Sequence, residues 1–103
     1  MMAVLIYAVT KDFPAEEKFG LTSQIRRAAI AVPSNVAEGS GRKTAKDQAH
    51  FYHIAYSSAL ELLNQLIISN DLDFITADQL MKCRILIEQV SNKLNSLRKS
   101  LVS

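Results

Sequence analysis

The chain has 103 residues, of which 49% are hydrophobic, and its formal net charge is +2. This length predicts one domain over residues 1–103, and only three glycines and two prolines indicate long elements with few turns, which favours an all-α fold. The single cysteine excludes an internal disulfide and, without a matching set of histidines and cysteines, the usual kind of zinc site. We therefore expect no cofactor and a reducing, cytoplasmic location.

The first segment, MMAVLIYAVTKD, is apolar but too short to span a membrane. It lacks a basic start and a small-residue cleavage site, so it is interpreted as a helix and not as a signal. Phe13-Pro14 ends it, because the proline ring disfavours a helical conformation in the preceding residue. A helix of about a dozen residues reaches only about 18 Å. Either the chain begins further upstream, or a neighbouring subunit covers the rest of the bundle.

A second helix is predicted from Leu21 to the glycines at 39 and 41. Its apolar residues recur at spacings of three and four, which is typical of a helix with one buried face: Leu21, Ile25, Ala28, Ala29, Val32 and Val36. Pro33 lies within this pattern and removes a helical hydrogen bond, so the helix is expected to bend there.

Two long helices are predicted to follow. Thr44 is the expected N-cap of the third, which should run to about Asn70. Its apolar residues follow a heptad pattern: Ala45, Ala49, Tyr52, Tyr56, Ala59, Leu63 and Leu66. Thr76 and Gln79 have the spacing of a capping box that opens the fourth helix. The pattern of that helix is the most regular in the chain, with Leu80, Cys83, Ile87, Val90, Leu94, Leu97 and Leu101 on one face.

Three stretches resemble one protein family: FGLTSQIRRAA at 19–29, PSNVAEG at 33–39 and SALELLNQL at 58–66. They are similar to the four helix bundle protein family, also known as the large-subunit rRNA intervening-sequence protein family, over about Leu5 to Leu101. The resemblance implies an antiparallel, up-down four-helix bundle that forms a homo-oligomer, often a ring of five. More remotely, the chain resembles the accessory protein of diversity-generating retroelements, which binds a reverse transcriptase and nucleic acid. The resemblance implies an architecture and no reaction.

The basic residues are unevenly distributed along the chain. In an antiparallel bundle the turn after the second helix lies at the same end as the carboxyl end of the fourth. We therefore expect a basic pole of Arg42, Lys43, Lys46, Arg98 and Lys99, with Asp71, Asp73 and Asp78 at the opposite end. Such a pole could bind the phosphates of RNA or DNA. Alternatively, these cations only complement helix dipoles, or the two poles of different copies meet and drive assembly.

A carboxylate, Glu61, lies among apolar residues of the third helix. If it is buried, it needs a cationic partner, because an unpaired buried charge costs several kcal/mol. We expect Arg26 or Arg27 to fill that role, with Asn35 and Glu38 extending the polar network beyond Pro33. A network that fixes the packing register, a ligand site and plain exposed surface are the three alternatives.

Residues suited to catalysis are few. Asp47, His50 and His53 have the spacing of half a di-metal site, but the second half is missing. Cys83 is expected to be a buried small hydrophobe, and the glycines at 39 and 41 leave a helix, whereas a phosphate loop leads into one. We therefore expect no enzyme and no metal site. We predict a cytoplasmic, oligomeric protein without a membrane segment. It is expected to be a binding or accessory module that associates with nucleic acid or a nucleic-acid enzyme. The alternative is a protein-interaction bundle without nucleic-acid contact.

Overall fold

The computed structural model describes residues 2–102 and contains no strand among them. Four α-helices pack against each other, which confirms the predicted all-α class. The elements in chain order are α1 (Met2–Thr10), the 3-10 turn η1 (Ala15–Glu17), α2 (Leu21–Ser40), α3 (Ala45–Asp71) and α4 (Ala77–Val102). No helix in this described part combines the length and the apolar character needed to cross a membrane.

Both predicted caps are confirmed. The Thr44 hydroxyl accepts a hydrogen bond from the backbone N–H of Asp47 at 3.1 Å and starts α3. Before α4, the Thr76 hydroxyl accepts from the N–H of Gln79 at 3.1 Å. The Gln79 side chain accepts in return from the N–H of Thr76 at 2.9 Å. Each cap satisfies backbone groups that the first helical turn leaves without partners, so both helix starts are encoded locally.

The α2 helix contains Pro33 and still continues as one element to Ser40. The bend expected at the proline stays a prediction. Near its carboxyl end, Gly39 is buried, and the ring of Tyr52 from α3 comes within 2.8 Å of the position that a β-carbon of residue 39 would take. The end of α2 therefore needs glycine for close helix packing. Gly41 then caps the helix, and its N–H donates to the Glu38 carbonyl at 3.2 Å.

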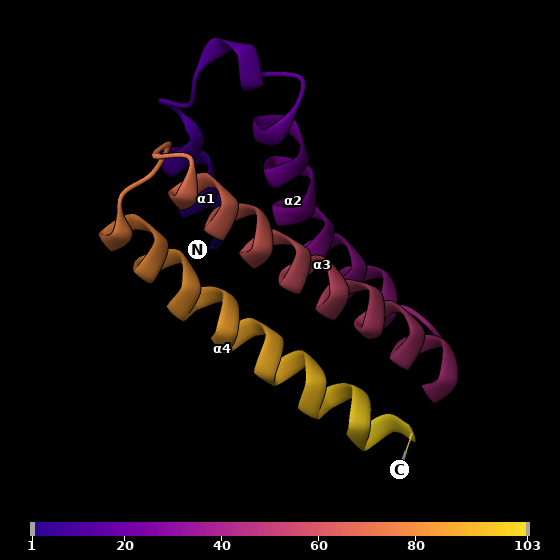
Figure 1. Cartoon of the computed structure of the whole chain (residues 1–103). Helices are drawn as coiled ribbons and strands as arrows, with labels where there is room; N and C mark the ends of the chain where they lie inside the picture. Colours follow the sequence, from indigo (N-terminus) through magenta and orange to yellow (C-terminus); the bar gives the residue numbers. More distant parts are fainter. Residues whose placement is uncertain (1, 103) are drawn as a thin grey trace.

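Figure 1 shows α3 between α2 and α4, and α3 packs against both of them. The elongated molecule measures 43 × 24 × 19 Å. A contact between Arg98 and His53 joins the last part of α4 to the first part of α3. The short α1 packs on α2 and α4. With nine residues, α1 is too short to accompany these longer helices along their whole length.

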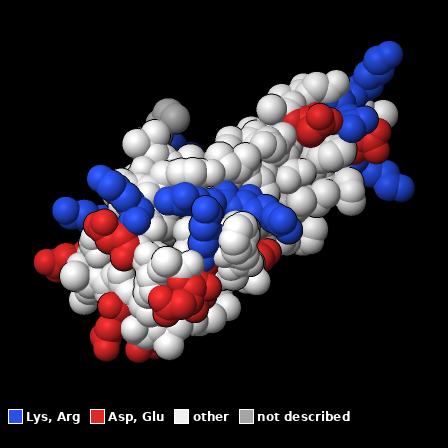
Figure 2. Space-filling model, turned by 90° about the horizontal axis from the view of Figure 1, so that it is seen from above, with Lys and Arg blue, Asp and Glu red and all other residues white. Residues whose placement is uncertain are grey.

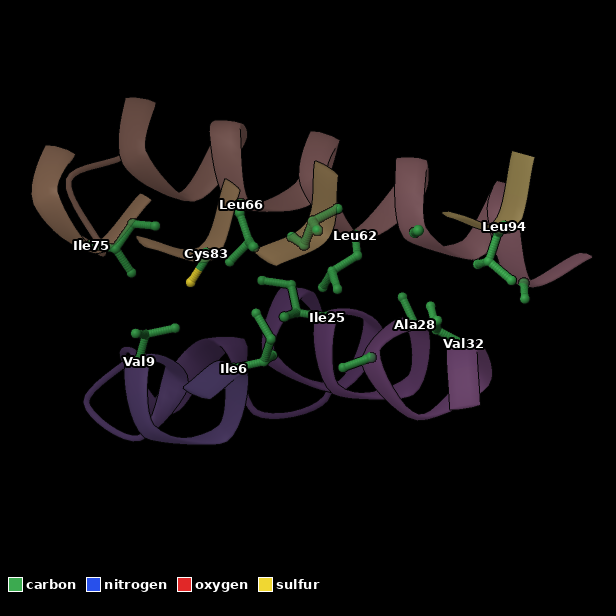
Figure 3. Packing of buried hydrophobic residues seen from close by; sticks show 14 of the residues in the cluster. Ile6, Val9, Ile25, Ala28, Val32, Leu62, Leu66, Ile75, Cys83 and Leu94 are labelled. Atoms are coloured by element: carbon green, nitrogen blue, oxygen red, sulfur yellow. The ribbon is translucent and has the colours of Figure 1, made fainter. Parts of the chain in front are cut away.

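The hydrophobic core gathers side chains from all four helices, which point toward one another in Figure 3. The largest fully buried apolar side chains include Ile6, Ile25, Leu62, Leu66 and Ile87. On α3, the buried face differs from the predicted heptad pattern. Ala55 and Leu62 are fully buried, whereas Tyr56 and Leu63 are only half-buried. The apolar stripe of α3 is wide enough to allow several faces, and contact with both α2 and α4 decides which one is buried.

On α4, the predicted positions Cys83, Ile87 and Leu94 are buried. Burial raises the pKa of the Cys83 thiol above its ordinary value, as expected for a small hydrophobe within a core. Leu97 was also predicted to be buried, and there the prediction is wrong, because 42% of this residue is exposed. No part of the nine-residue α1 reaches far enough along α4 to cover it.

An apolar groove of about 450 Å³ opens where the amino end of α1 leaves α2 and α4 uncovered. Its lining is almost entirely apolar: Met2, Ala3, Val32, Pro33, Val36, Ala37 and Val90. The groove follows from the mismatch in helix length, because the space between α2 and α4 is filled only where α1 is present. The structure thus locates the uncovered apolar surface that the sequence predicted.

Candidate nucleic-acid interface

Arg42 lies just beyond the carboxyl end of α2. Its Nη2 atom is 3.0 Å from a Glu38 carboxylate oxygen, one helical turn earlier. Its guanidinium carbon is 4.5 Å from the centre of the Phe51 ring on α3. The ion pair is exposed and contributes at most about 1 kcal/mol. The ring contact also holds the guanidinium against α3.

Arg98, near the end of α4, also reaches α3. Its Nη1 atom donates to Nδ1 of His53 at 2.8 Å, and its Nη2 atom donates to the Asn95 side-chain oxygen at 2.7 Å. The guanidinium carbon is 5.3 Å from the centre of the Tyr56 ring. Arg42, which precedes α3 in the sequence, and Arg98, which follows it, therefore both contact residues 51–56 of α3. The structure brings these two predicted residues to one end of the bundle.

The three lysines of the predicted basic pole are exposed around the same end. Lys43 lies in the connection between α2 and α3, Lys46 in the first turn of α3, and Lys99 in the last turn of α4. Figure 2 shows Lys and Arg side chains at the right-hand end of the molecule, with some acidic side chains beside them. Glu38 and Asp47 are the exposed carboxylates of this region. The acidic residues Asp71, Asp73 and Asp78 lie, exposed, around the connection between α3 and α4.

The spacing of Asp47, His50 and His53 does not produce a metal-binding cluster. Across residues 2–102, no three His, Cys, Asp or Glu side chains come together in a way that could hold a metal ion. His53 Nδ1 instead accepts from Arg98, and the His50 ring packs edge-on against Phe51 with centroids 5.4 Å apart. Both histidines therefore line the surface next to the basic end.

The polar network predicted around Glu61 is not formed. Glu61 is exposed, and its carboxylate accepts a hydrogen bond from the Gln65 side chain at 3.1 Å. Glu61 and Arg27 both line a groove of about 430 Å³ between α2 and α3. Among the described residues, however, the ion pairs are Arg42–Glu38 and Arg84–Glu88 only. Glu61 adjoins the buried Leu62, and one residue turns a helix by about 100°, which brings the carboxylate into water.

The other members of the predicted network point elsewhere. Arg26 turns toward α1, where its Nε atom donates to the Thr10 hydroxyl at 3.0 Å and its guanidinium carbon is 4.6 Å from the centre of the Tyr7 ring. The Asn35 side chain donates to the Ala31 carbonyl of its own helix at 2.8 Å. Glu38 pairs with Arg42. Arg26, Asn35 and Glu38 thus find their partners on α1, on α2 or just beyond it, and within residues 2–102 none of the three has a hydrogen bond to α3.

This placement gives a prediction for Glu61. Replacing it by Gln is expected to change the free energy of unfolding by no more than about 0.5 kcal/mol, because an exposed carboxylate leaves no buried cation behind. Urea unfolding of Glu61→Gln beside the unchanged protein measures this difference. A loss of about 3 kcal/mol or more is the cost of breaking a buried pair, and would show that Glu61 does pair with Arg27.

A hollow at the other end of α2 was not predicted from the sequence. Lys18 and Phe19 precede that helix, and together with Tyr7 they line a hollow beside Arg26 and Arg27. The periodic patterns could not find it, because Lys18 and Phe19 lie in a turn outside any helical repeat. The one available signal was an aromatic residue between a lysine and a glycine in a predicted turn.

The four helices that pack together among residues 2–102 place the chain in the class of small all-α bundle proteins. A model of the 23S rRNA-intervening sequence protein family matches residues 1–96. The chain therefore belongs to this family, and the resemblance drawn from its sequence motifs is confirmed. No curated protein matches the chain.

Proposed function

We propose that this chain is a non-enzymatic, homo-oligomeric binding module that associates with nucleic acid or with a nucleic-acid enzyme. The observation that carries the proposal is the convergence of Arg42 and Arg98 on residues 51–56 of α3, with Lys43, Lys46 and Lys99 exposed around them. Cations held at one end of a bundle can contact several phosphates at once. The name of the family, which refers to an rRNA, is consistent with a nucleic-acid partner.

Oligomerisation is the second part of the proposal. Each copy would be an antiparallel, up-down bundle with α2 bent at Pro33. A neighbouring copy would cover the apolar groove beside α1 and the exposed Leu97. Further exposed apolar residues lie on α1, α3 and α4, among them Val4, Leu60 and Ile85. A ring of five is the assembly that the family resemblance favours, and it would repeat the basic end around a rim. The cytoplasmic location stays a prediction.

Assembly is tested by light scattering coupled to size-exclusion chromatography. The expected mass is several times the 11.4 kDa of one chain, because contiguous apolar surface beyond a few hundred Å² is unusual on monomers. A pentamer would give about five times the monomer mass. A monodisperse monomer at micromolar concentration would contradict the oligomeric part of the proposal.

Nucleic-acid binding is tested by fluorescence anisotropy with a labelled single-stranded RNA and a labelled duplex DNA. Affinity is expected to fall steeply between low and physiological salt, because binding releases counterions from the phosphates. Replacing Arg42, Lys43 and Lys46 together by Gln should weaken binding without changing the oligomeric mass.

The matched control replaces Asp71, Asp73 and Asp78 by Asn at the opposite end of the bundle, and it should not weaken binding. If neither nucleic acid binds at low salt, the nucleic-acid part of the proposal is wrong. A protein-interaction bundle without nucleic-acid contact is then the better interpretation.

A further inference from the structure

A hollow of about 660 Å³ lies between α1, the η1 turn and the first half of α2. It is far from the basic end described above, because the hollow surrounds the start of α2 at Leu21, whereas the basic end lies beyond the last residue of α2, Ser40. Its lining includes Tyr7, Lys18, Phe19, Thr22, Arg26 and Arg27. Figure 2 shows Lys and Arg side chains in a band across the left half of the molecule, apart from those at the right-hand end.

Three of these residues are cations, and no carboxylate lines the hollow. None of the three forms an ion pair in the part of the chain that the structure describes. Glu17 is nearby, but its carboxylate accepts from the backbone N–H of Leu21 at 3.3 Å. Arg26 is fixed by Thr10 and the Tyr7 ring. A concave surface with three cations and no lining carboxylate is complementary to an anionic ligand.

The hollow also carries exposed aromatic surface. Phe19 is 90% exposed, the largest fraction among the exposed large hydrophobic residues. The Lys18 ammonium is 5.5 Å from the centre of the Phe19 ring, and Tyr7 is 42% exposed beneath the Arg26 guanidinium. An exposed ring beside cations is the combination by which proteins stack an unpaired base and bind the adjoining phosphate.

A third observation is the Thr22 side chain in the first turns of α2. The residue is only 8% exposed, and its hydroxyl oxygen has no hydrogen-bond partner among residues 2–102. Thr22 lines this hollow and also a smaller neighbouring one, which it shares with Thr10, Lys18 and Arg26. Buried hydroxyl groups are nearly always hydrogen-bonded in folded proteins. The oxygen is covered by its neighbours, so a polar ligand group in the hollow would reach it only after the Thr22 side chain rotates.

We propose that this hollow binds single-stranded nucleic acid, with an unpaired base on Phe19 and the adjoining phosphates on Lys18, Arg26 and Arg27. A single strand fits better than a duplex, because only an unstacked base can lie against a protein ring. The exposed carboxylate of Glu16, in the η1 turn beside the hollow, is not part of its lining, and it would repel a broad anionic surface such as a membrane more than a narrow strand. The inference rests on the proposed nucleic-acid function and assigns to it a second contact surface.

The experiment measures anisotropy of a labelled oligouridine and of a duplex of the same length with three variants of the hollow and two controls. Phe19→Ala should weaken binding of the single strand by about tenfold, the scale of one base–aromatic stack, while Phe19→Tyr should retain it. Arg27→Gln should lower the slope of log affinity against log salt by about 0.7, the contribution of one phosphate contact on a single strand. The duplex should be little affected by the Phe19 variants.

Two exposed residues of α4 outside the hollow serve as matched controls: Met81→Ala for the lost apolar side chain and Lys82→Gln for the lost cation. Both controls should bind the single strand as the unchanged protein does. Equal losses in the controls and in the Phe19 and Arg27 variants would overturn the proposal. Circular dichroism of each variant checks that the helices are intact.

Photo-crosslinking to 5-iodouridine RNA locates the contact directly. Trypsin cleaves after Lys18 and Arg26, so the expected crosslink is on the peptide of residues 19–26. If the strand binds but crosslinks only to residues near 42–46, and only the Gln variant of Arg42, Lys43 and Lys46 loses affinity, the hollow is not a site and the proposed function stands. If no nucleic acid binds at low salt, both proposals are wrong. Phe19-dependent sedimentation with anionic vesicles in that case would indicate a membrane surface instead.

Discussion

Replacing Leu62 by Ala is expected to reduce the free energy of unfolding by about 2–5 kcal/mol. Leu62 is fully buried in the middle of α3 and points into the core shared by all four helices (Figure 3). Truncation removes buried apolar surface and leaves a cavity that long, packed helices fill poorly. A domain of this size has a total stability of about 5–15 kcal/mol, so the loss should be visible as a large decrease in the urea midpoint and in Tm.

The matched control is Leu60→Ala, two residues earlier on the same helix. Leu60 is 46% exposed, so its truncation should change the stability of one chain by no more than about 0.5 kcal/mol. An equal loss at both positions would show that Leu60 is covered in solution. Protein concentration distinguishes the causes, because stability that comes from an interface between copies rises with concentration.

Gly39→Ala is expected to destabilise the bundle although alanine is the better helix former. The added methyl group would be 2.8 Å from Cε1 of Tyr52, 3.0 Å from its Cδ1 and 3.1 Å from the Cβ of Phe51. Overpacking of this kind costs about 1–3 kcal/mol, against a gain in helix propensity of about 1 kcal/mol. The Tyr52 ring is buried and its hydroxyl lies 3.2 Å from that of Ser40, so the ring cannot move away freely. The net result should be a loss, measured by thermal unfolding.

Gly41→Ala provides the control two residues later. Gly41 has φ −88° and ψ −4°, which alanine adopts without strain, and the nearest atom to its new methyl group would be the Glu38 carbonyl oxygen at 3.7 Å. This substitution should be neutral or should stabilise by about 0.4–1 kcal/mol, because it reduces the freedom of the unfolded chain. If Gly39→Ala and Gly41→Ala change the thermal stability alike, α2 and α3 do not pack closely at Gly39.

The sequence by itself determined the local structure of the chain. The caps at Thr44 and Thr76 depend on side chains within three residues of the helix starts, so the boundaries of α3 and α4 could be predicted closely. The buried positions Cys83, Ile87 and Leu94 could be predicted as well, because a regular heptad leaves one apolar face. The motifs at 19–29, 33–39 and 58–66 were sufficient to indicate the family.

Only the tertiary structure decided what each polar side chain meets and which apolar face is covered. Glu61 lies among leucines in the sequence, but the orientation of α3 exposes it, and Arg26 turns to Thr10 and Tyr7 on α1. Leu97 continues the heptad of α4, but the nine-residue α1 does not reach it. The hollow around Phe19 joins a turn to two helices. Such contacts depend on the relative length and rotation of neighbouring helices, which no periodicity within one helix specifies.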